Sequence, residues 1–483
     1  MPWRWGKSRP RAAPKAAGQP HGESNKPQGV WTVSSAPAAG EGVPQEEGVA
    51  QDVLHGPLLL IRVTLRGLGM VPYRYSCASR RYELRWRSWR GAHTLAVLVW
   101  LSGLVVSTCV GLATVFLQAQ PVRATASGSH EVQLMGMAII VGCLLNAWVE
   151  VLNLVMLGQP LCAFLNQWQQ LAARTTLDPT RGLRLASCVY AIFLYAFVVA
   201  VLVVAVLGPP AMLMDIVDLL AQVLFLVDPR WLAQDTLPVQ VVRVVVGMVV
   251  GHLYMVYKGS LFLFVTICHM LHNVLECWRH QLAHTLHVAW EGAGDVVEEP
   301  VWGCSQMVQL EQLVQSHWQV VVMVRKTEHL FSSTLQCFYA TQVVTLCLEL
   351  YLVAYRIGAG AGYAGQEAAW QTIIIFQTCI VFFLVSLKAS RVYEEAERCV
   401  DVLRRGLPYT ASEKDKHHYG ELTLALTASP ICISGGRFFY INRPFIITVV
   451  GAVVSYFIIV LQLKHPSVSG QDVLATTALN HSV

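Results

Sequence analysis

Seven stretches of the chain are long and apolar enough to cross a bilayer as helices. At 1.5 Å per residue, about twenty apolar residues span the ~30 Å hydrocarbon core of a membrane. The last stretch, PFIITVVGAVVSYFIIVLQL, has no acidic or basic side chain and opens with Pro444, which the first turn of a helix tolerates. The pattern therefore predicts an all-α membrane protein with seven transmembrane helices. We place the spans at residues 92–118, 133–157, 184–208, 239–266, 329–355, 370–389 and 444–463.

Small and polar residues follow one side of the last predicted helix. Thr448, Ala452, Ser455, Ile459 and Gln462 recur at steps of four and three, so they share one helical face. Small residues on one face are the usual material of helix–helix packing in membranes. A stripe that ends in a glutamine also fits a pore lining, because a polar group inside a membrane needs a partner in protein or water. The pattern alone leaves both interpretations open.

The end of this stretch resembles a known family motif. Ser455-Tyr456, five apolar residues and Gln462-Leu463 are similar to the C-terminal TY-x5-QF signature of insect-type gustatory receptors. Ser455 stands in place of Thr and Leu463 in place of Phe, and both changes keep the chemistry. The preceding residues 438–443, FFYINR, are similar to the lead-in of that signature. Over the rest of the chain only the pattern of spans agrees with the family.

The resemblance implies both an architecture and a function. Members of that family are seven-helix, ligand-gated cation channels in which the last helix of each of four subunits lines the pore. The resemblance implies a homotetramer in contact with membrane lipid, in the plasma membrane of a sensory neuron. It also implies that an extracellular small-molecule tastant opens the channel to Na⁺, K⁺ and Ca²⁺. A hetero-oligomer with related receptors and an odorant-receptor-like subunit of the same superfamily remain open. The pore and gate residues implied are Ser455, Ile459, Gln462 and Leu463.

Composition supports the membrane class independently. Of the 483 residues, 54% are hydrophobic and 13% charged, whereas a soluble domain carries about 25% charged residues. Residues 1–52 are rich in Pro, Gly, Ala, Glu and Lys, which predicts a disordered cytoplasmic tail. Residues 53–91 combine a short apolar run with arginines and tryptophans, which is typical of an interfacial segment. Nucleic-acid binding by these arginines is disfavoured by the adjoining span.

Lys and Arg residues predict the orientation. They are dense before the first span and in residues 390–443, between the sixth and seventh spans, and the opposite loops are poor in them. The positive-inside rule then places the N-terminus in the cytoplasm and residues 464–483 in an extracellular tail. Helical patterns in 267–328 and 390–443 predict cytoplasmic helices, and the second segment is predicted to break at Pro408 and to turn at Gly435-Gly436. The resemblance implies that these helices form an anchor region. The alternative function is a G-protein-coupled receptor, which the predicted cytoplasmic N-terminus and the absence of cysteine from the outer loops disfavour. A transporter is also disfavoured, because the sequence shows no repeated halves.

Polar side chains inside the predicted spans 92–389 are candidates for a ligand pocket, because each costs free energy in lipid unless it faces protein or a cavity. In the predicted orientation they gather in the outer half, where carboxamides, a carboxylate and an indole suit a hydroxyl-rich ligand such as a sugar. Interhelical hydrogen bonding is the plainer interpretation of any one of them. The candidate ligand-binding residues are Asn146, His252, Gln342, Glu349, Tyr351, Trp370 and Gln377.

Other chemistry has little support in the sequence. His280, His284 and His287 share one helical face, as zinc ligands can, but no Cys or carboxylate completes the set, so we predict a solvated face without metal. No phosphate loop or catalytic triad indicates an enzyme or a cofactor. Glu150 and Lys258 both fall in the predicted inner half, where they could form a structural ion pair.

Overall fold

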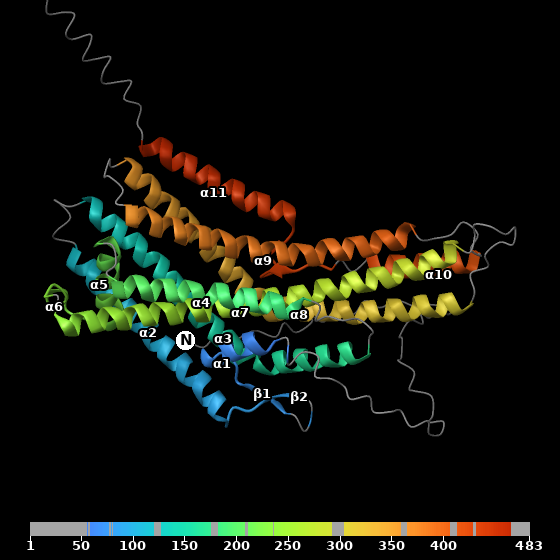
Figure 1. Cartoon of the computed structure of the whole chain (residues 1–483). Helices are drawn as coiled ribbons and strands as arrows, with labels where there is room; N and C mark the ends of the chain where they lie inside the picture. Colours follow the sequence, from blue (N-terminus) through green and yellow to red (C-terminus); the bar gives the residue numbers. More distant parts are fainter. Residues whose placement is uncertain are drawn as a thin grey trace, which may run out of the picture. The chain divides into compact units, whose positions relative to one another are not determined.

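The structure is a computed structural model, and its described part is mostly helical (Figure 1). The predicted tails, 1–52 and the residues beyond Lys464, lie outside the described residues. The description covers residues 56, 58–76, 79, 81–119, 127–174, 182–207, 211–234, 236–291, 304–358, 365–405, 413–427 and 431–464.

Seven helices in the described ranges are long and apolar enough to cross a membrane, which confirms the predicted number of spans. Several continue well past the predicted ends. Helices α7 and α8 have 55 residues each, about 80 Å at 1.5 Å per residue and more than twice the ~30 Å hydrocarbon core. The spans are therefore continuous with helices that extend beyond the membrane. The seven are α2 (Trp89–Ala119), α3 (Ser127–Arg174), α4 (Leu183–Leu207), α7 (Leu237–Glu291), α8 (Cys304–Gly358), α9 (Gly365–Arg405) and α11 (Arg443–Lys464).

Helix α7 is the central helix of the bundle, and it packs against α3, α4, α8 and α9. Half of its most apolar segment is buried within the chain, the largest share among the seven spans. This burial follows from its sequence, since residues 253–271 are apolar on nearly every side. Helix α11 is the opposite case. It packs mainly against α8, only 17% of its segment is buried, and Figure 1 shows it at the edge of the bundle.

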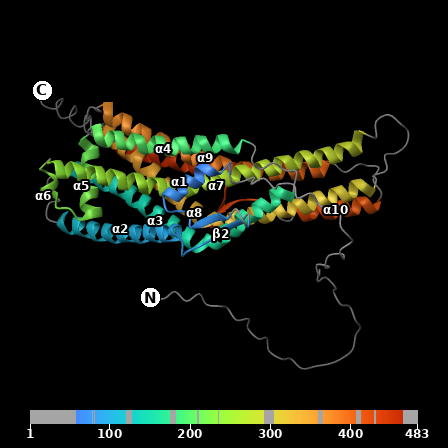
Figure 2. The same cartoon turned by 60° about the horizontal axis from the view of Figure 1, so that its bottom comes forward.

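A second, smaller core lies where α7, α8 and α9 continue past the membrane segments and meet α10 (Glu413–Thr427), as Figure 2 shows. Trp278 in α7 donates its indole N–H to the Leu313 carbonyl of α8 at 2.8 Å. The carboxylate of Glu395 in α9 is 1% exposed and accepts from Arg279 of α7 at 2.5 Å. These contacts join the segments that the sequence predicts as cytoplasmic helices. The apolar members are Trp278, Leu282, Leu286, Leu310, Val314, Cys399, Leu403 and Tyr419.

The segment before the first span contains helix α1 (Leu59–Gly67), where an interfacial helix is expected. One face of α1 packs on the main core through Ile61 and Leu65, whereas Leu59 and Val63 on the opposite face are exposed. Its position at a membrane surface stays a prediction. A hairpin of β1 (Tyr73–Ser76) and β2 (Arg81–Leu84) follows, which the sequence analysis did not predict.

The predicted loop between the third and fourth spans also contains helices, α5 (Ala211–Phe225) and α6 (Pro229–Leu232). Arg243 of α7 forms two hydrogen bonds to the carboxylate of Asp218 in α5, at 2.8 and 2.9 Å. Asp218 therefore holds α5 against α7. The Asp218 side chain is 24% exposed.

The approach to α11 contains the predicted turn. Strands β3 (Ser434–Gly435) and β4 (Phe439–Tyr440) form a short antiparallel pair, and Gly436 between them has a φ of +62°, a conformation that glycine adopts readily. The turn predicted at Gly435-Gly436 is confirmed. The helix break predicted at Pro408 lies outside the described residues.

Candidate functional site

Helix α11 begins with a capped first turn. The Asn442 side-chain oxygen accepts a hydrogen bond from the backbone N–H of Phe445 at 3.0 Å, which satisfies one of the donors that a helix leaves unpaired at its start. Pro444 occupies the same turn, where its missing N–H loses no helical bond. The local sequence therefore fixes where the last helix starts.

The two sides of α11 meet different surroundings. Ile446, Val453 and Val460 are buried at a spacing of seven residues, so one narrow face packs on the rest of the chain. The predicted stripe lies on another side. At 100° per residue its five residues centre about 140° from the buried face. All five are exposed in this single chain: Thr448, Ala452, Ser455, Ile459 and Gln462.

The other two motif residues, Tyr456 and Leu463, do not belong to the stripe. Tyr456 is 37% exposed beside the buried face. Leu463 belongs to the helix, but its side chain lies outside the described residues. The structure thus groups Ser455, Ile459 and Gln462 on one face that the chain itself does not cover.

An aromatic cluster that the sequence analysis missed holds the base of α11. The Phe439 and Phe445 rings stack with centroids 4.6 Å apart, and the Tyr339 ring of α8 meets both edge-on at 5.3 and 5.1 Å. The Tyr339 hydroxyl hydrogen-bonds to the Ser386 hydroxyl of α9 at 2.8 Å. The run FFYINRPF was the available signal, since it concentrates aromatic residues directly before the span.

An ion pair lies beside this cluster. Arg443, the first residue of α11, donates to both oxygens of Glu394 in α9 at 2.6 Å each. Because the guanidinium fork matches a carboxylate, this geometry fixes direction as well as distance. The start of α11 is therefore held by α8 through rings and by α9 through a bidentate pair.

Three of the seven predicted pocket residues lie in a belt of interhelical hydrogen bonds. Asn146 of α3 donates to the Thr341 hydroxyl of α8 at 2.5 Å, and Gln342 donates to the Thr378 carbonyl of α9 at 2.9 Å. Gln377 donates to the Tyr254 hydroxyl of α7. The belt thus joins α3, α8, α9 and α7 in one layer. The sequence analysis predicts one partner of each bond, whereas the Thr341 hydroxyl and the Thr378 carbonyl carry no periodic signal that would identify them.

The remaining predicted pocket residues are placed differently. Glu349 is buried two turns from Gln342 along α8, and its backbone carbonyl accepts from Gln371 of α9 at 3.2 Å. Tyr351 is half-buried on the same helix. His252 turns away from the belt toward α2, where its ring meets the Trp100 ring edge-on at 5.2 Å.

Three expectations outside the belt are settled or left open. Trp370 belongs to α9, but its side chain lies outside the described residues. Glu150 and Lys258 do not pair, so that prediction was wrong: the Lys258 ammonium lies 4.1 Å from the Tyr257 ring centroid, and Glu150 accepts from Thr334. The predicted histidine face is exposed at His280 and His284, and the His287 side chain is outside the described part.

Comparisons with known proteins agree with this architecture. A family model described as 7tm chemosensory receptor matches residues 58–465. The insect olfactory receptor OR5 from Machilis hrabei, solved in complex with eugenol, matches with a TM-score of 0.62 and 17% identity over 85% of this chain and 100% of that chain. A second structure of the same receptor gives a TM-score of 0.57 and 16% identity over 85% and 98%. A direct sequence comparison with curated proteins gives no match.

At these identities the structural likeness shows the fold, and the family model shows the family. Its match extends from α1 to the end of α11, far beyond the C-terminal motif. It confirms the resemblance to the chemoreceptor superfamily and the placement in a membrane with several crossings. The chain therefore belongs to the 7tm chemosensory receptor family.

Proposed function

We propose that the chain is one subunit of a gustatory-type, ligand-gated cation channel in the plasma membrane, a homotetramer in which α11 of each subunit lines the pore. A small tastant opens it from outside. The N-terminus is cytoplasmic, the C-terminus is extracellular, and the ends of α7, α8 and α9 with α10 form a cytoplasmic anchor. Olfactory-type receptors of the superfamily are the alternative subtype, and the motif around Ser455-Tyr456 favours the gustatory type.

One observation carries the pore proposal. The small and polar stripe of α11 is exposed about 140° from the face that packs on the chain. In a monomer this stripe would meet lipid, where the Gln462 carboxamide would lose its hydrogen bonds with water. Four copies around an axis place the stripe against water and passing ions instead. Because Ile446, Val453 and Val460 already attach α11 to its own subunit, the stripe is free for this role.

The packing-face alternative makes a different demand. If the stripe only packs on a neighbouring helix, Gln462 must be hydrogen-bonded across that contact, and ions never approach it. Both alternatives need an oligomer. They differ in whether the stripe is in contact with water. Residues on the stripe are reachable by polar reagents only in the pore arrangement.

The polar belt supports a ligand site in the half of the bundle beyond it, toward Glu349 and Trp370. Carboxamides and a carboxylate there suit hydroxyl groups, and a sugar is the ligand class that we infer. The eugenol held by OR5 is a small organic molecule, which supports a ligand of similar scale within this fold. Interhelical bonds of Asn146, Gln342 and Gln377 would then form the floor of the site.

The test is electrophysiological and uses introduced cysteines. Ligand-evoked cation current in cells without added G protein supports the channel, and a response that requires G protein contradicts it. In the same cells, Ser455→Cys and Ile459→Cys on the stripe should be blocked by charged thiol reagents during opening. Phe457→Cys, which lies toward the packed side, is the matched control and should not react. Equal reactivity of all three would contradict the pore assignment.

A further inference from the structure

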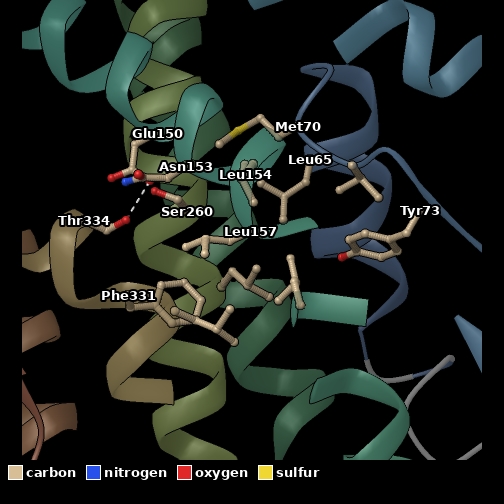
Figure 3. Close-up of a pocket in the computed structure, with 14 residues that line it drawn as sticks. Leu65, Met70, Tyr73, Glu150, Asn153, Leu154, Leu157, Ser260, Phe331 and Thr334 are labelled. Carbon is tan, nitrogen blue, oxygen red and sulfur yellow. Dashed lines mark hydrogen bonds between the residues drawn. The ribbon is translucent and has the colours of Figure 1, made fainter. Parts of the chain in front are cut away.

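A small cavity lies in the half of the bundle away from the proposed ligand site (Figure 3). Its volume is about 30 Å³. Helices α3, α7 and α8 form most of its wall, and Leu65 and Met70 from α1 and the turn after it close one side. Neither the pore helix nor the polar belt contributes to it. The cavity is thus a separate feature of the fold, enclosed partly by the segment before the first span.

Four oxygen-bearing side chains gather at one end of this cavity, and apart from Tyr73 across from them the remaining lining residues are apolar. They come from three helices: Glu150 and Asn153 from α3, Ser260 from α7 and Thr334 from α8. The Thr334 hydroxyl donates to one oxygen of Glu150 at 3.0 Å. Figure 3 shows Ser260 and Asn153 beside this pair. The side-chain nitrogen of Asn153 is buried without a hydrogen-bond partner among the described residues.

The charge of Glu150 has no basic partner in the described part of the chain. Glu150 is 2% exposed, and Lys258, the expected partner, lies on the Tyr257 and Phe338 rings instead. An isolated carboxylate in a membrane interior is strongly unfavourable. It must therefore be neutralised by a proton or by a bound cation. A proton needs neither a cavity nor further oxygen ligands. The surroundings of Glu150 provide a cavity and additional side-chain oxygens, as a cation would require.

The volume selects the kind of occupant. One water molecule needs about 10–15 Å³, and a cavity that holds benzene measures about 150 Å³, so this cavity suits a small ion with a water rather than an organic ligand. Carboxylate, hydroxyl and carboxamide oxygens are the ligands that hard cations prefer. A single carboxylate balances one positive charge, whereas divalent-cation sites commonly use several. A bound water also gives the Asn153 nitrogen an acceptor.

We propose that Glu150, Asn153, Ser260 and Thr334 form a buried binding site for a monovalent alkali cation, with Na⁺ favoured over K⁺ by the small volume. The ion joins α3, α7 and α8. Because α8 is also the main neighbour of α11, occupancy stabilises the part of the bundle on which the pore helix rests. The site does not depend on the channel proposal, because it is complete within one chain.

The experiment measures thermal unfolding of the purified full-length protein without tastant, in NaCl, KCl or choline chloride at equal ionic strength. A ligand that binds only the folded state raises Tm in a saturable way. Na⁺ should raise Tm more than K⁺, and choline should have no effect. Thr334→Val removes one oxygen ligand while keeping the side-chain shape, so the half-maximal Na⁺ concentration should rise about tenfold or more. Glu150→Gln should abolish the dependence on Na⁺.

A matched control separates this site from other effects of salt. Thr327→Val makes the same substitution two turns earlier on α8, at a buried threonine outside the cavity, and should keep the Na⁺ response of the unchanged protein. If Glu150→Gln does not fold, Thr334→Val and Ser260→Ala still decide. Equal Tm in all three salts would show that a proton neutralises Glu150. An unchanged Na⁺ response in Thr334→Val would show that the ion binds elsewhere. Either of these two results would overturn the proposal of a cation site. A protein that conducts no current would contradict the channel proposal but not this one.

Discussion

Tyr339 connects α8 with both α11 and α9, and two substitutions separate its contributions. Outside its own helix, its ring makes edge-on contacts with Phe382, Phe439 and Phe445 at centroid distances of 5.9, 5.3 and 5.1 Å. Its hydroxyl bonds to Ser386. Tyr339→Phe removes only the hydrogen bond, and Tyr339→Ala removes the ring contacts as well.

The expected magnitudes differ. An interhelical hydrogen bond in a membrane protein contributes about 0.6 kcal/mol on average and about 1.7 kcal/mol at most. Each aromatic pair adds about 0.5–1.5 kcal/mol beyond its buried area, so the three pairs sum to about 1.5–4.5 kcal/mol. One kcal/mol shifts Tm by about 2–4 °C in domains of 150–250 residues, and by less in larger chains. Tyr339→Phe should therefore lower Tm by only a few degrees, and Tyr339→Ala by at least twice as much.

The assay combines thermal unfolding with ligand-evoked current. Tyr339→Phe should keep near-normal current, because the rings still hold the base of α11. Tyr339→Ala should reduce current per surface receptor, because the start of α11 loses its contacts with α8. Equal Tm losses for the two variants, or normal current in Tyr339→Ala, would refute the role of the ring cluster.

Two further predictions test the orientation and the ligand site. An antibody should reach an epitope tag at residue 20 only after permeabilisation, whereas it should reach a tag after Val483 on intact cells. Labelling of the tag at residue 20 on intact cells would contradict the proposed orientation. Glu349→Gln should raise the half-maximal tastant concentration about tenfold or more at normal surface expression, because a hydrogen bond to a charged group contributes about 1.5–3 kcal/mol. Trp370→Ala should raise it as well, because it removes the predicted indole contact with the ligand. Unchanged dose–response curves for both would move the site elsewhere.

The sequence predicts the spans well and the segments between them poorly. A long apolar stretch has few alternatives to a membrane helix, so all seven spans were found, and the stripe of α11 followed from a helical period alone. Helix α5 and the β1–β2 hairpin are not predicted from the sequence. Asp218 holds α5 against α7 through Arg243, which lies 25 residues further along the chain. Pairing of distant residues has no local signal.

The same limit applies inside the bundle. Asn146, Gln342 and Gln377 were singled out because polar residues are rare in spans, and the structure gives each an interhelical partner. The partner hydroxyl of Thr341 and the partner carbonyl of Thr378 have no comparable signal in the sequence. Glu150 was assigned to Lys258 from depth alone, although the two side chains face different neighbours.

The central claim is that α11 lines the pore, and the most direct measurement is the reversal potential of Gln462 variants under mixed Na⁺ and Ca²⁺. Four copies of Gln462 around the axis would form a ring of carboxamides in the ion path. Gln462→Glu replaces the carboxamides with carboxylates, which should shift the reversal potential toward the Ca²⁺ equilibrium potential. This holds even though mutual repulsion keeps some of the carboxylates protonated. Gln462→Lys should repel cations and sharply reduce current. Surface abundance is measured alongside, and identical selectivity of both variants at normal surface levels would show that Gln462 does not face the ions.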